Sequence, residues 1–360
     1  MEKKTLAVLF GGVSSEHAVS CVSAATVLRN LDKEKYTVLP VGITKDGHWL
    51  LFESEDYDAV ESGAWESSSK LTPAVLSPDR TTHGLLVQRE LGVQAVRVDC
   101  AIPALHGVGG EDGTMQGLLE LAHIPYVGPG VAASANSMDK SLTKIIVAHA
   151  GGVRQAAFYL ARRAAFRRDP DSVTRAAEQE LGSYPVFVKP CSQGSSVGVT
   201  KATDFDSLKA GLEQGFAYDS KVLVEEFIDG HEIEVAVRGN ENPEASFAGE
   251  IAPSREFYTY EAKYVDGSSD LYIPAHISDS AMQRVREDAV RVYQALDCQG
   301  LARVDFFCTY DGDEIVFNEI NTLPGFTSIS MYPKLQEHMG LKLPALLDCL
   351  IELAMERYDG

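Results

Sequence analysis

Two apolar stretches near the C-terminus carry the side chains with the clearest chemical potential. The segment 301–325 reads LARVDFFCTYDGDEIVFNEINTLPG, in which two strand-like runs flank the turn sequence DGD. Because side chains alternate along a strand, Arg303 and Asp305 share one face, and Glu319 and Asn321 share one face of the next strand. If the turn contains residues 311–313, Asp305 lies opposite Glu319 and Arg303 lies opposite Asn321. A two-residue turn would put the two pairs on different faces.

This set of side chains predicts a metal site. Two carboxylates and one amide on a single face, from Asp305, Glu319 and Asn321, provide the oxygen ligands that Mg²⁺ prefers. The alternative is a solvated sheet face with ordinary surface charges. The strongly apolar neighbours along both strands favour the metal site.

A second candidate site follows a predicted strand that ends at Lys189. The segment 186–199 reads VFVKPCSQGSSVGV, so a lysine precedes a Gly/Ser loop. Backbone N–H groups of such a loop can hold phosphate oxygens, and the lysine supplies positive charge. The Walker A spacing and the G-x-G-x-x-G spacing are both missing here, and a flexible Gly/Ser turn is the alternative interpretation.

Two further candidates stand where predicted strands end. His106 ends a strand and precedes a glycine-rich turn and a helix that we expect from about residue 114. Ligand contacts gather at such strand ends in open α/β sheets. Glu16 begins a helix after the first strand, where a carboxylate is also favoured by the helix dipole alone.

An aromatic stretch, FYTYEAKYVDG at 257–267, fits neither a regular helix nor a regular strand. Turn-rich segments flank it, so we expect a long, ordered, omega-type loop over 252–275 that carries Lys263 and Tyr264 for a purpose.

The elements that must position these residues alternate between strand and helix. We predict strands at 5–10, 36–43, 96–105, 156–161, 184–189, 301–310 and 314–319, with two more opening the stretch after 221. We predict helices at 16–30, 114 onward, 133–150, 171–182, 278–297 and 343–357. The strand–helix alternation in the first third indicates a parallel sheet, while 53–90 is uninformative.

Composition limits the class of protein. The 360 residues, 45% hydrophobic, exceed one core of ordinary size, so two or three domains are expected. The net charge of −20 argues against nucleic-acid or acidic-membrane partners, and no stretch has the roughly 20 apolar residues of a membrane span. Six scattered cysteines without a C-x-x-C pair indicate free thiols in a reducing cytoplasm.

The motifs taken together resemble the D-alanine–D-alanine ligase family of the ATP-grasp superfamily. The matching pieces, in order, are GGVSSEHAVS, LHGVGGEDGTMQG, MDK, KPCSQGSSVG, EAKY and RVDFF with NEINTLPG, and they extend from Phe10 to about Lys334. The resemblance implies an α/β fold with a parallel N-terminal domain (1–130), a central small domain (131–220) and a C-terminal domain (221–360), the last two providing two sheets that clamp ATP. It also implies a cytoplasmic homodimer that joins two D-alanines for the peptidoglycan precursor through a D-alanyl phosphate.

The resemblance implies a role for each matched residue. Glu16, Lys263, Ser330 and Met331 would bind the amino-acid substrates, and Glu16, His106, Ser195, Tyr264, Arg303 and Gly325 would act at the reacting centre, with Arg303 and Gly325 at the oxyanion. ATP would contact Lys140, Lys189, Ser195, Ser196, Glu225, Phe227, Ile228, Glu232 and Lys263. Asp305, Glu319 and Asn321 would bind two Mg²⁺ ions, with Mn²⁺ as a substitute.

Two other functions are weighed against this one. Sister ligases make D-alanyl-D-lactate or D-alanyl-D-serine. A histidine near position 264 repels a second ammonium in the lactate type, whereas Tyr264 is neutral at pH 7. D-Serine stays open, because an apolar pocket rejects an added hydroxyl only weakly. An inactive regulatory module is disfavoured, since all three metal ligands and both phosphate lysines are present. Departures from the family pattern are His17, Ile329 and the segment GGVRQAAF at 151–158.

Overall fold

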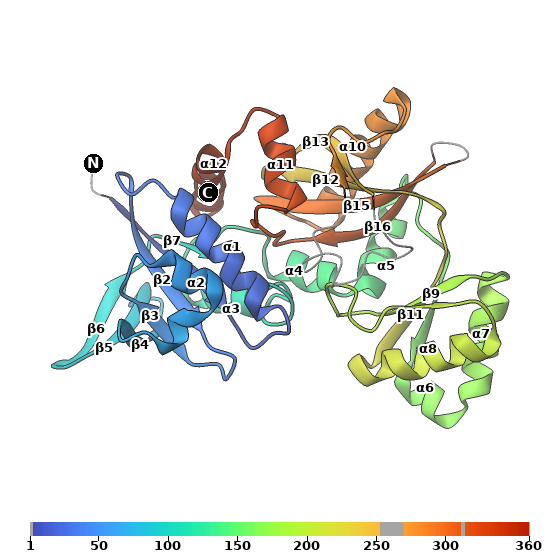
Figure 1. Cartoon of the computed structure of the whole chain (residues 1–360), viewed down its shortest axis with the longest axis horizontal. Helices are drawn as coiled ribbons and strands as arrows, with labels where there is room; N and C mark the ends of the chain where they lie inside the picture. Colours follow the sequence, from blue (N-terminus) through green and yellow to red (C-terminus); the bar gives the residue numbers. More distant parts are fainter. Residues whose placement is uncertain (1–2, 253–269, 311–313, 360) are drawn as a thin grey trace.

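The computed structural model describes residues 3–252, 270–310 and 314–359. Its elements form three sheets of seven, four and five strands (Figure 1). The chain passes through the sheets in order and then returns to the first one with its final helix.

The first sheet has the strand order β6-β5-β4-β3-β2-β1-β7. Its strands are β1 (Lys4–Gly11), β2 (Tyr36–Ile43), β3 (Trp49–Phe52), β4 (Leu71–Leu76), β5 (Gly84–Arg89), β6 (Gly92–Arg97) and β7 (Cys100–Pro103). The predicted parallel arrangement is confirmed for β2, β1 and β7, whereas β3 to β6 add antiparallel hairpins. The sequence did not predict these hairpins because the polar segment 53–90 lacks a clear apolar period. This segment also contains α2 (Tyr57–Ser62) and the 3-10 turn η1 (Ala64–Ser67). The predicted strand 96–105 is two strands, since β6 ends before β7 begins.

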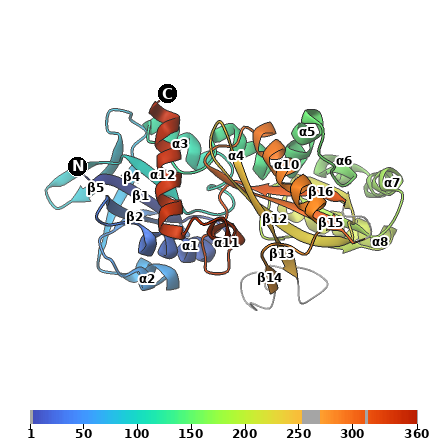
Figure 2. The same ribbon diagram turned by 90° about the horizontal axis from the view of Figure 1, so that it is seen from above.

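Helices cover both faces of this sheet, and the alternation within β1 shows how. Leu6, Val8 and Phe10 pack with α1 (His17–Asn30) and α12 (Leu343–Asp359). Ala7 and Leu9 face the other way and pack with α3 (Thr114–Ala122). Figure 2 shows α12, from the end of the chain, lying beside the strands of its beginning.

The second sheet is antiparallel, in the order β10-β9-β11-β8. Its strands are β8 (Phe158–Arg162), β9 (Val186–Pro190), β10 (Thr200–Ala202) and β11 (Lys221–Glu226), and its helices are α6 (Arg163–Arg168), α7 (Pro170–Leu181) and α8 (Phe205–Tyr218). Val186, Val188 and Val222 face the helices. Because side chains alternate along a strand, the odd-numbered residues of β9 and β11, including Lys189 and Glu225, point to the other face.

The third sheet is antiparallel, in the order β14-β13-β12-β15-β16. Its strands are β12 (Gly230–Arg238), β13 (Glu244–Ala252), β14 (Asp270–Tyr272), β15 (Leu301–Thr309) and β16 (Ile315–Asn321). α10 (Asp279–Ala295) covers one face and shares its core with α4 (Val131–Met138) and α5 (Lys140–Ala150). α11 (Met331–His338) packs against the opposite face near β12 and β13. The predicted helix 133–150 is two helices, because the Asp139 side chain caps α5 by accepting from Ser141 and Leu142.

Sheet membership differs from the predicted domain boundaries near residues 130 and 220. α4 and α5 follow the first boundary but belong to the core of the third sheet. β11 follows the second boundary but is an inner strand of the second sheet. A strand joins a sheet through its hydrogen-bond partners, which the order of the chain does not reveal. The boundaries stay predictions.

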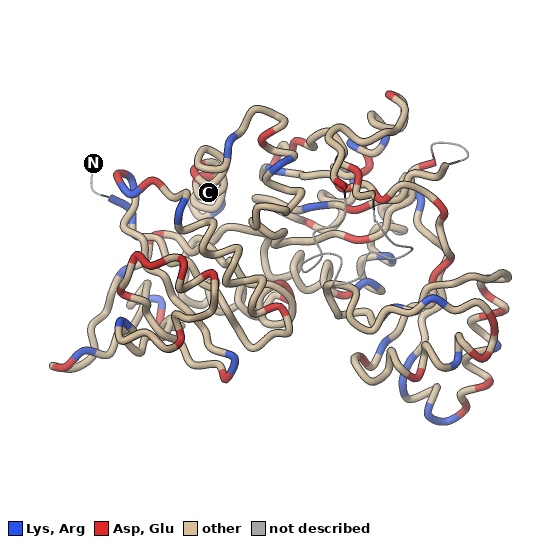
Figure 3. Tube along the Cα trace, viewed as in Figure 1, with Lys and Arg blue, Asp and Glu red and all other residues tan. Residues whose placement is uncertain are grey.

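Charges are interspersed along the described chain. Figure 3 shows Lys and Arg mixed with Asp and Glu over all three sheets. None of the described helices is long and apolar enough to cross a membrane.

Candidate active site

The predicted pairing of β15 with β16 is confirmed where the chemistry lies. Arg303 pairs with Asn321, and Asp305 pairs with Glu319. Closer to the turn the register differs by one residue, since Phe306 pairs with Phe317, and Asn318 is the extra residue between the two registers. The predicted pairs therefore depend on a β-bulge at Asn318, which the sequence argument did not contain. The turn residues 311–313 lie outside the described part of the chain.

Arg303 is the centre of a charged network on this face. Its Nε lies 2.8 Å from Asp305 Oδ1 and its Nη2 lies 2.7 Å from Oδ2, a bidentate pair. Glu234 Oε2 lies 3.1 Å from the same Nε. Burial opposes the charge, but Asp305 and Glu234 outweigh it and raise the pKa of the guanidinium. The guanidinium is thus a fixed cation aimed along the sheet surface.

Glu234 is a residue of this network that the sequence motifs did not predict. Its signal is the alternation of HEIEVAV, which puts Glu232 and Glu234 on one face of β12. Glu234 pairs with Asp305 in the register of β12 with β15. Only the strand order, which sequence does not supply, shows that this face is the one that carries Arg303.

Lys140 connects the metal-ligand candidates to the Gly/Ser loop. Its Nζ lies 3.2 Å from Glu319 Oε2 and donates to Gln193 O at 2.9 Å. Burial disfavours the ammonium, but Glu319 outweighs that effect and raises the pKa of Lys140. The first residue of α5 therefore places a cation between the third sheet and the loop after β9.

Lys189 and Glu225 meet on the open face of the second sheet. Lys189 Nζ lies 2.6 Å from Glu225 Oε2 and 3.2 Å from Asn318 Oδ1. Among the other predicted ATP residues, the Phe227 ring lies near Phe187, with centroids 5.9 Å apart. Ile228 is buried against Val316, and Glu232 lies on β12. The Lys189–Asn318 contact therefore joins the second sheet to the third.

Glu16 is held at the start of α1 by the Gly/Ser loop. Ser195 Oγ donates a hydrogen bond to Glu16 Oε1. Ser195 and Ser196 have φ values of 50° and 60°, a strained backbone that persists only when the surroundings impose it. A Cβ on Gly107 would lie 2.4 Å from Glu16 Oε2, and one on Gly194 would lie 2.9 Å from it. Two glycines therefore allow the backbone to enclose this carboxylate. The neighbouring His17 points elsewhere, toward Gly12 O and Glu66.

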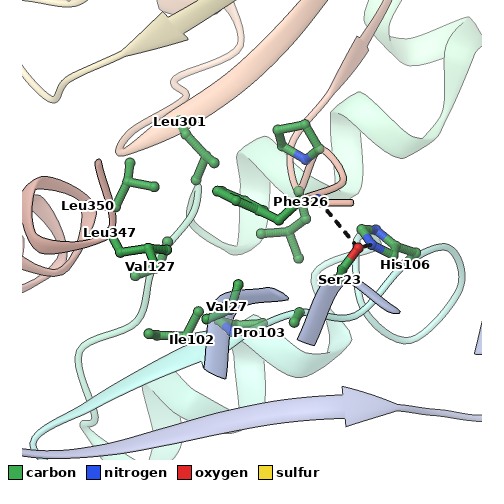
Figure 4. A pocket seen from close by; sticks show the side chains of 13 residues that line it. Ser23, Val27, Ile102, Pro103, His106, Val127, Leu301, Phe326, Leu347 and Leu350 are labelled. Atoms are coloured by element: carbon green, nitrogen blue, oxygen red, sulfur yellow. Dashed lines mark hydrogen bonds between the residues drawn. The ribbon is translucent and has the colours of Figure 1, made fainter. Parts of the chain in front are cut away.

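His106 is a buried, neutral ring on the edge of an apolar cavity. Its Nε2 lies 2.9 Å from Ser23 Oγ, which also accepts the Phe326 N–H at 3.4 Å (Figure 4). Burial lowers the pKa of His106. Figure 4 shows the apolar side chains behind it, including Val27, Ile102 and Leu350, which line a small cavity.

Glu111 is a second residue that the sequence argument missed. Its Oε2 accepts the Gly107 N–H at 2.8 Å. Burial and the nearby Glu16 raise the pKa of this carboxyl to about 8. The glycine-rich run had already been singled out, but nothing in it distinguished Glu111 from Asp112.

The loop after β16 brings the last predicted residues to the site. Ser330 directly precedes α11, and its Oγ accepts the Thr327 N–H at 3.0 Å. A Cβ on Gly325 would lie 2.8 Å from Ser330 Oγ, so the loop passes close to this hydroxyl. Met331 is buried beside Gly249.

One cavity gathers many of these side chains from the strands and loops of all three sheets. Its lining includes the predicted residues Glu16, His106, Ser195, Arg303, Glu319, Asn321, Gly325, Ser330 and Met331, together with Glu111, Gly194 and Glu234. The lining does not include Asp305 or the predicted nucleotide residues Lys140, Lys189, Ser196, Glu225, Phe227, Ile228 and Glu232. Lys140 contacts Glu319 of the lining, and Lys189 contacts the adjacent Asn318. Lys263 and Tyr264 lie outside the described residues.

The metal-ligand candidates are engaged with cations in this structure. Asp305 pairs with Arg303 and accepts from Asn321 Nδ2 at 2.9 Å, and Glu319 pairs with Lys140. No cluster of three or more His, Cys, Asp or Glu side chains among the described residues is arranged to hold a metal ion. The set of two carboxylates and one amide still consists of hard oxygen donors on adjacent strands, which fits Mg²⁺.

Comparison with known proteins gives a consistent match over the whole chain. The family model described as D-ala D-ala ligase N-terminus matches residues 5–129, and the model described as D-ala D-ala ligase C-terminus matches residues 147–352. The D-alanine–D-alanine ligase of Caldicellulosiruptor bescii is 48% identical over 359 residues, covering 99% of this chain and 96% of the relative. The enzyme of the same name from Clostridium acetobutylicum is 46% identical, covering 99% and 100%.

Solved structures agree with the sequence matches. The D-Ala:D-Ser ligase of Enterococcus faecalis has a TM-score of 0.88 and 39% identity, covering 98% of this chain and 100% of that one. The D-alanine–D-alanine ligase of Coxiella burnetii has a TM-score of 0.85 and 34% identity, covering 99% and 96%.

Proposed function

The chain belongs to the D-alanine–D-alanine ligase family, and on that premise we propose that it joins two D-alanines into D-alanyl-D-alanine while ATP is converted to ADP and phosphate. The supporting observation is the cavity in which Glu16, Arg303 and Ser330 converge from separate parts of the chain. A carboxylate to hold an ammonium, a guanidinium to hold an oxyanion and a hydroxyl to hold a carboxylate are what two amino-acid substrates require. The product is a building block of peptidoglycan.

The reaction needs two steps, because a carboxylate is a poor electrophile. A carboxylate oxygen of the first D-alanine attacks the γ-phosphorus of ATP, the bond from that phosphorus to the bridging oxygen breaks, and ADP leaves. The amine of the second D-alanine then attacks the acyl carbon and loses a proton, and the carbon–oxygen bond breaks to release phosphate.

The residues of this chain supply the electrostatics of both steps. Lys140 contacts Glu319, and Lys189 contacts the adjacent Asn318. Both ammonium groups would balance the charge of the phosphoryl group during its transfer. Arg303 would stabilise the tetrahedral oxyanion, an effect worth about 3–4 kcal/mol for one donor. Glu16, tied to Ser195 of the Gly/Ser loop, would fix the first ammonium while that loop excludes water from the acyl phosphate.

We propose that Asp305, Glu319 and Asn321 hold Mg²⁺. Bound Mg²⁺ would neutralise phosphate charge during transfer. For the ions to bind, Glu319 must exchange its contact with Lys140, and Asp305 must share its contact with Arg303. The number of ions, two in our proposal, is open to measurement by titration.

A test of the metal site is Glu319→Gln. The variant keeps the size of the side chain but removes its charge, so ATP turnover should fall by at least about a hundredfold while the unfolding temperature changes little. Turnover and Mg²⁺ dependence are measured by ADP release in parallel with thermal unfolding. Retained activity with unchanged Mg²⁺ dependence would overturn the assignment.

The function itself is tested by phosphate release with ATP and Mg²⁺. D-Alanine alone should support turnover and yield the dipeptide by mass spectrometry. D-Serine or D-lactate supplied with D-alanine distinguishes the sister activities, since a mixed product would then exceed the D-alanine dipeptide. The E. faecalis structure, named for D-Ala:D-Ser activity, makes the D-serine arm the necessary comparison.

We also propose that the enzyme acts as a homodimer in the cytoplasm. The support is the family resemblance for the dimer, and the buried free cysteines for a reducing compartment. Sedimentation of the purified chain over a range of concentrations tests the dimer directly.

A further inference from the structure

A buried lysine that the proposed mechanism does not use lies behind the predicted nucleotide site. Lys144, on α5, has a side chain that is 2% exposed, and its Nζ lies 2.9 Å from Glu225 Oε1. Glu225 Oε2 lies 2.6 Å from Lys189 Nζ. The carboxylate of β11 is therefore shared by two lysines, one from the helix and one from β9.

The two lysines differ in how tightly they are held. Lys144 Nζ also lies 3.5 Å from Ala156 O and 5.3 Å from the centroid of the Phe158 ring. The Lys144 carbonyl accepts from Gln155 Nε2 at 3.1 Å, which fixes the helix at this point. Lys189 is more exposed, at 15%, and its second partner, Asn318, lies across the space between the sheets.

The charges show why a single lysine would be insufficient. Burial opposes ionisation of Glu225, but Lys189 and Lys144 together outweigh it and lower the pKa of the carboxyl to about 2. The family resemblance implies that Glu225 belongs to the stretch that contacts the adenine and ribose of ATP. We therefore expect Lys189 to leave Glu225 for the phosphates, while Glu225 faces the base. A buried carboxylate that loses its only cation is strongly destabilised. Lys144 is the cation that stays.

We propose that Lys144 is a positioning residue for the nucleotide: it holds Glu225 in place as an acceptor for the base and thereby frees Lys189 for the phosphates. This inference rests on the proposed function. Without Lys144, Lys189 is the remaining cation for Glu225. Lys189 must then either stay with Glu225, which faces the base, or leave it unpaired to contact the phosphates.

The first test is Lys144→Met, which keeps most of the length of the side chain and removes its charge. KM for ATP should rise at least about tenfold, while kcat at saturating ATP stays within about twofold. The preference for ATP over inosine triphosphate, which lacks the exocyclic amino group, should fall by a similar factor. Lys144→Arg should restore part of the loss. The matched control is Lys209→Met, on α8 of the second sheet, where the lysine pairs with Asp171 at the surface.

A purely structural lysine would give another result. Partial unfolding would lower kcat in proportion to the active fraction and leave KM for ATP and the base preference unchanged. That outcome would overturn the proposal.

The second test is a double-mutant cycle with Glu225→Gln, which does not depend on the stability of the single variant. The pair Lys144→Met/Glu225→Gln buries no unpaired charge, so it is expected to fold even if Lys144→Met does not. If Lys144 acts through Glu225, the double variant should have the same KM for ATP as Glu225→Gln alone, within about twofold. A further rise of tenfold in the double variant would show that Lys144 acts by another route.

Direct binding of MgATP without amino acid separates this inference from the proposed function. If the wild-type chain binds MgATP but releases no phosphate with D-alanine, the ligase function fails while the binding cycle still tests Lys144. If the wild-type chain is active and the cycle is additive, only the role of Lys144 fails.

Discussion

At the residue scale, Gly107 and Gly194 lie so close to the Glu16 carboxylate that a larger residue at either position would displace it. In Gly194→Ala the new Cβ would lie 2.9 Å from Glu16 Oε2, and that carboxylate is the flexible group that must move. We expect the variant to fold normally, and KM for D-alanine to rise about ten- to a hundredfold because the ammonium-binding carboxylate is displaced. Steady-state kinetics with D-alanine as the varied substrate measure this.

A glycine on another element offers the control. Gly117 lies inside α3 with no heavy atom within 4 Å of its added Cβ. Gly117→Ala should therefore leave KM for D-alanine unchanged and add slightly to stability, since alanine favours helix. An equal effect of both substitutions would contradict the role given to Gly194.

Glu111 predicts a pH dependence of stability. Its pKa of about 8 in the folded chain exceeds the ordinary value of about 4.3, so the folded state binds its proton more tightly than the unfolded state. The stability that the Glu111 carboxyl contributes to the fold is fully present below its ordinary pKa of about 4.3 and is lost as pH rises through about 8. Glu111→Gln removes this loss, so the free energy of unfolding should decline less between about pH 7 and pH 8 than in the wild type.

The choice of pH window keeps another group out of the measurement. Burial lowers the pKa of His106. Titration of this ring therefore changes the free energy of unfolding only at pH values of about 6.5, its ordinary pKa, and below. Parallel declines for wild type and Glu111→Gln in urea titrations would contradict the assigned pKa.

The residues that sequence reasoning found and those that it missed differ in a physical respect. Asp305, Glu319 and Arg303 were found because strand alternation puts them on one face. Lys144 and Glu111 were missed because each is defined by a partner on another element, Glu225 for one and Glu16 for the other. A buried ionisable group inside a helix or a glycine-rich run has no periodic signal of its own.

At the element scale, the β15–β16 pair shows how a correct prediction can rest on an incomplete argument. The predicted three-residue turn gives the observed partners of Arg303 and Asp305. The ladder next to the turn is displaced by one residue, and the bulge at Asn318 restores the register. Bulges depend on the twist of the neighbouring strands, so alternation alone does not predict them. The bulged residue is also the one that contacts Lys189.

The packing of α12 on the first sheet predicts a large loss of stability on truncation of its apolar face. Leu350 is 1% exposed, and it packs in the cluster of α1 and β1 beside the cavity behind His106. Leu350→Ala should lower the free energy of unfolding by about 2–5 kcal/mol. Glu352→Ala, an exposed change on the same helix, should alter it by less than about 0.5 kcal/mol. Denaturant unfolding followed by circular dichroism compares the two, and a similar loss in both would contradict the packing.

At the scale of the whole molecule, burial determines the pKa values of the cysteine thiols and thereby their expected reactivity. The six cysteines are free, and all except the half-buried Cys349 are buried. Burial raises the pKa of Cys21 to about 11 and that of Cys100, Cys191 and Cys298 to about 12. Few thiolates are therefore present near neutral pH.

A thiol titration tests this arrangement. In the native protein at neutral pH, Cys349 should react slowly and the other cysteines should not react within the same period. All six should react once the chain is unfolded in denaturant. Rapid reaction of several thiols in the native state would contradict the burial of these side chains.

The return of α12 to the first sheet also affects biosynthesis. The last helix supplies Leu346, Leu347, Leu350 and Ile351 to the core that contains Leu6, Val8 and Phe10 of β1. Asp348 of this helix also pairs with Lys35 and accepts from Tyr36 near the start of the chain. While the ribosome is still making the middle of the protein, the first sheet lacks one of its two covers on that face. Until α12 has been made, the apolar side chains of Leu6, Val8 and Phe10 therefore lack part of the cover that they have in the folded chain.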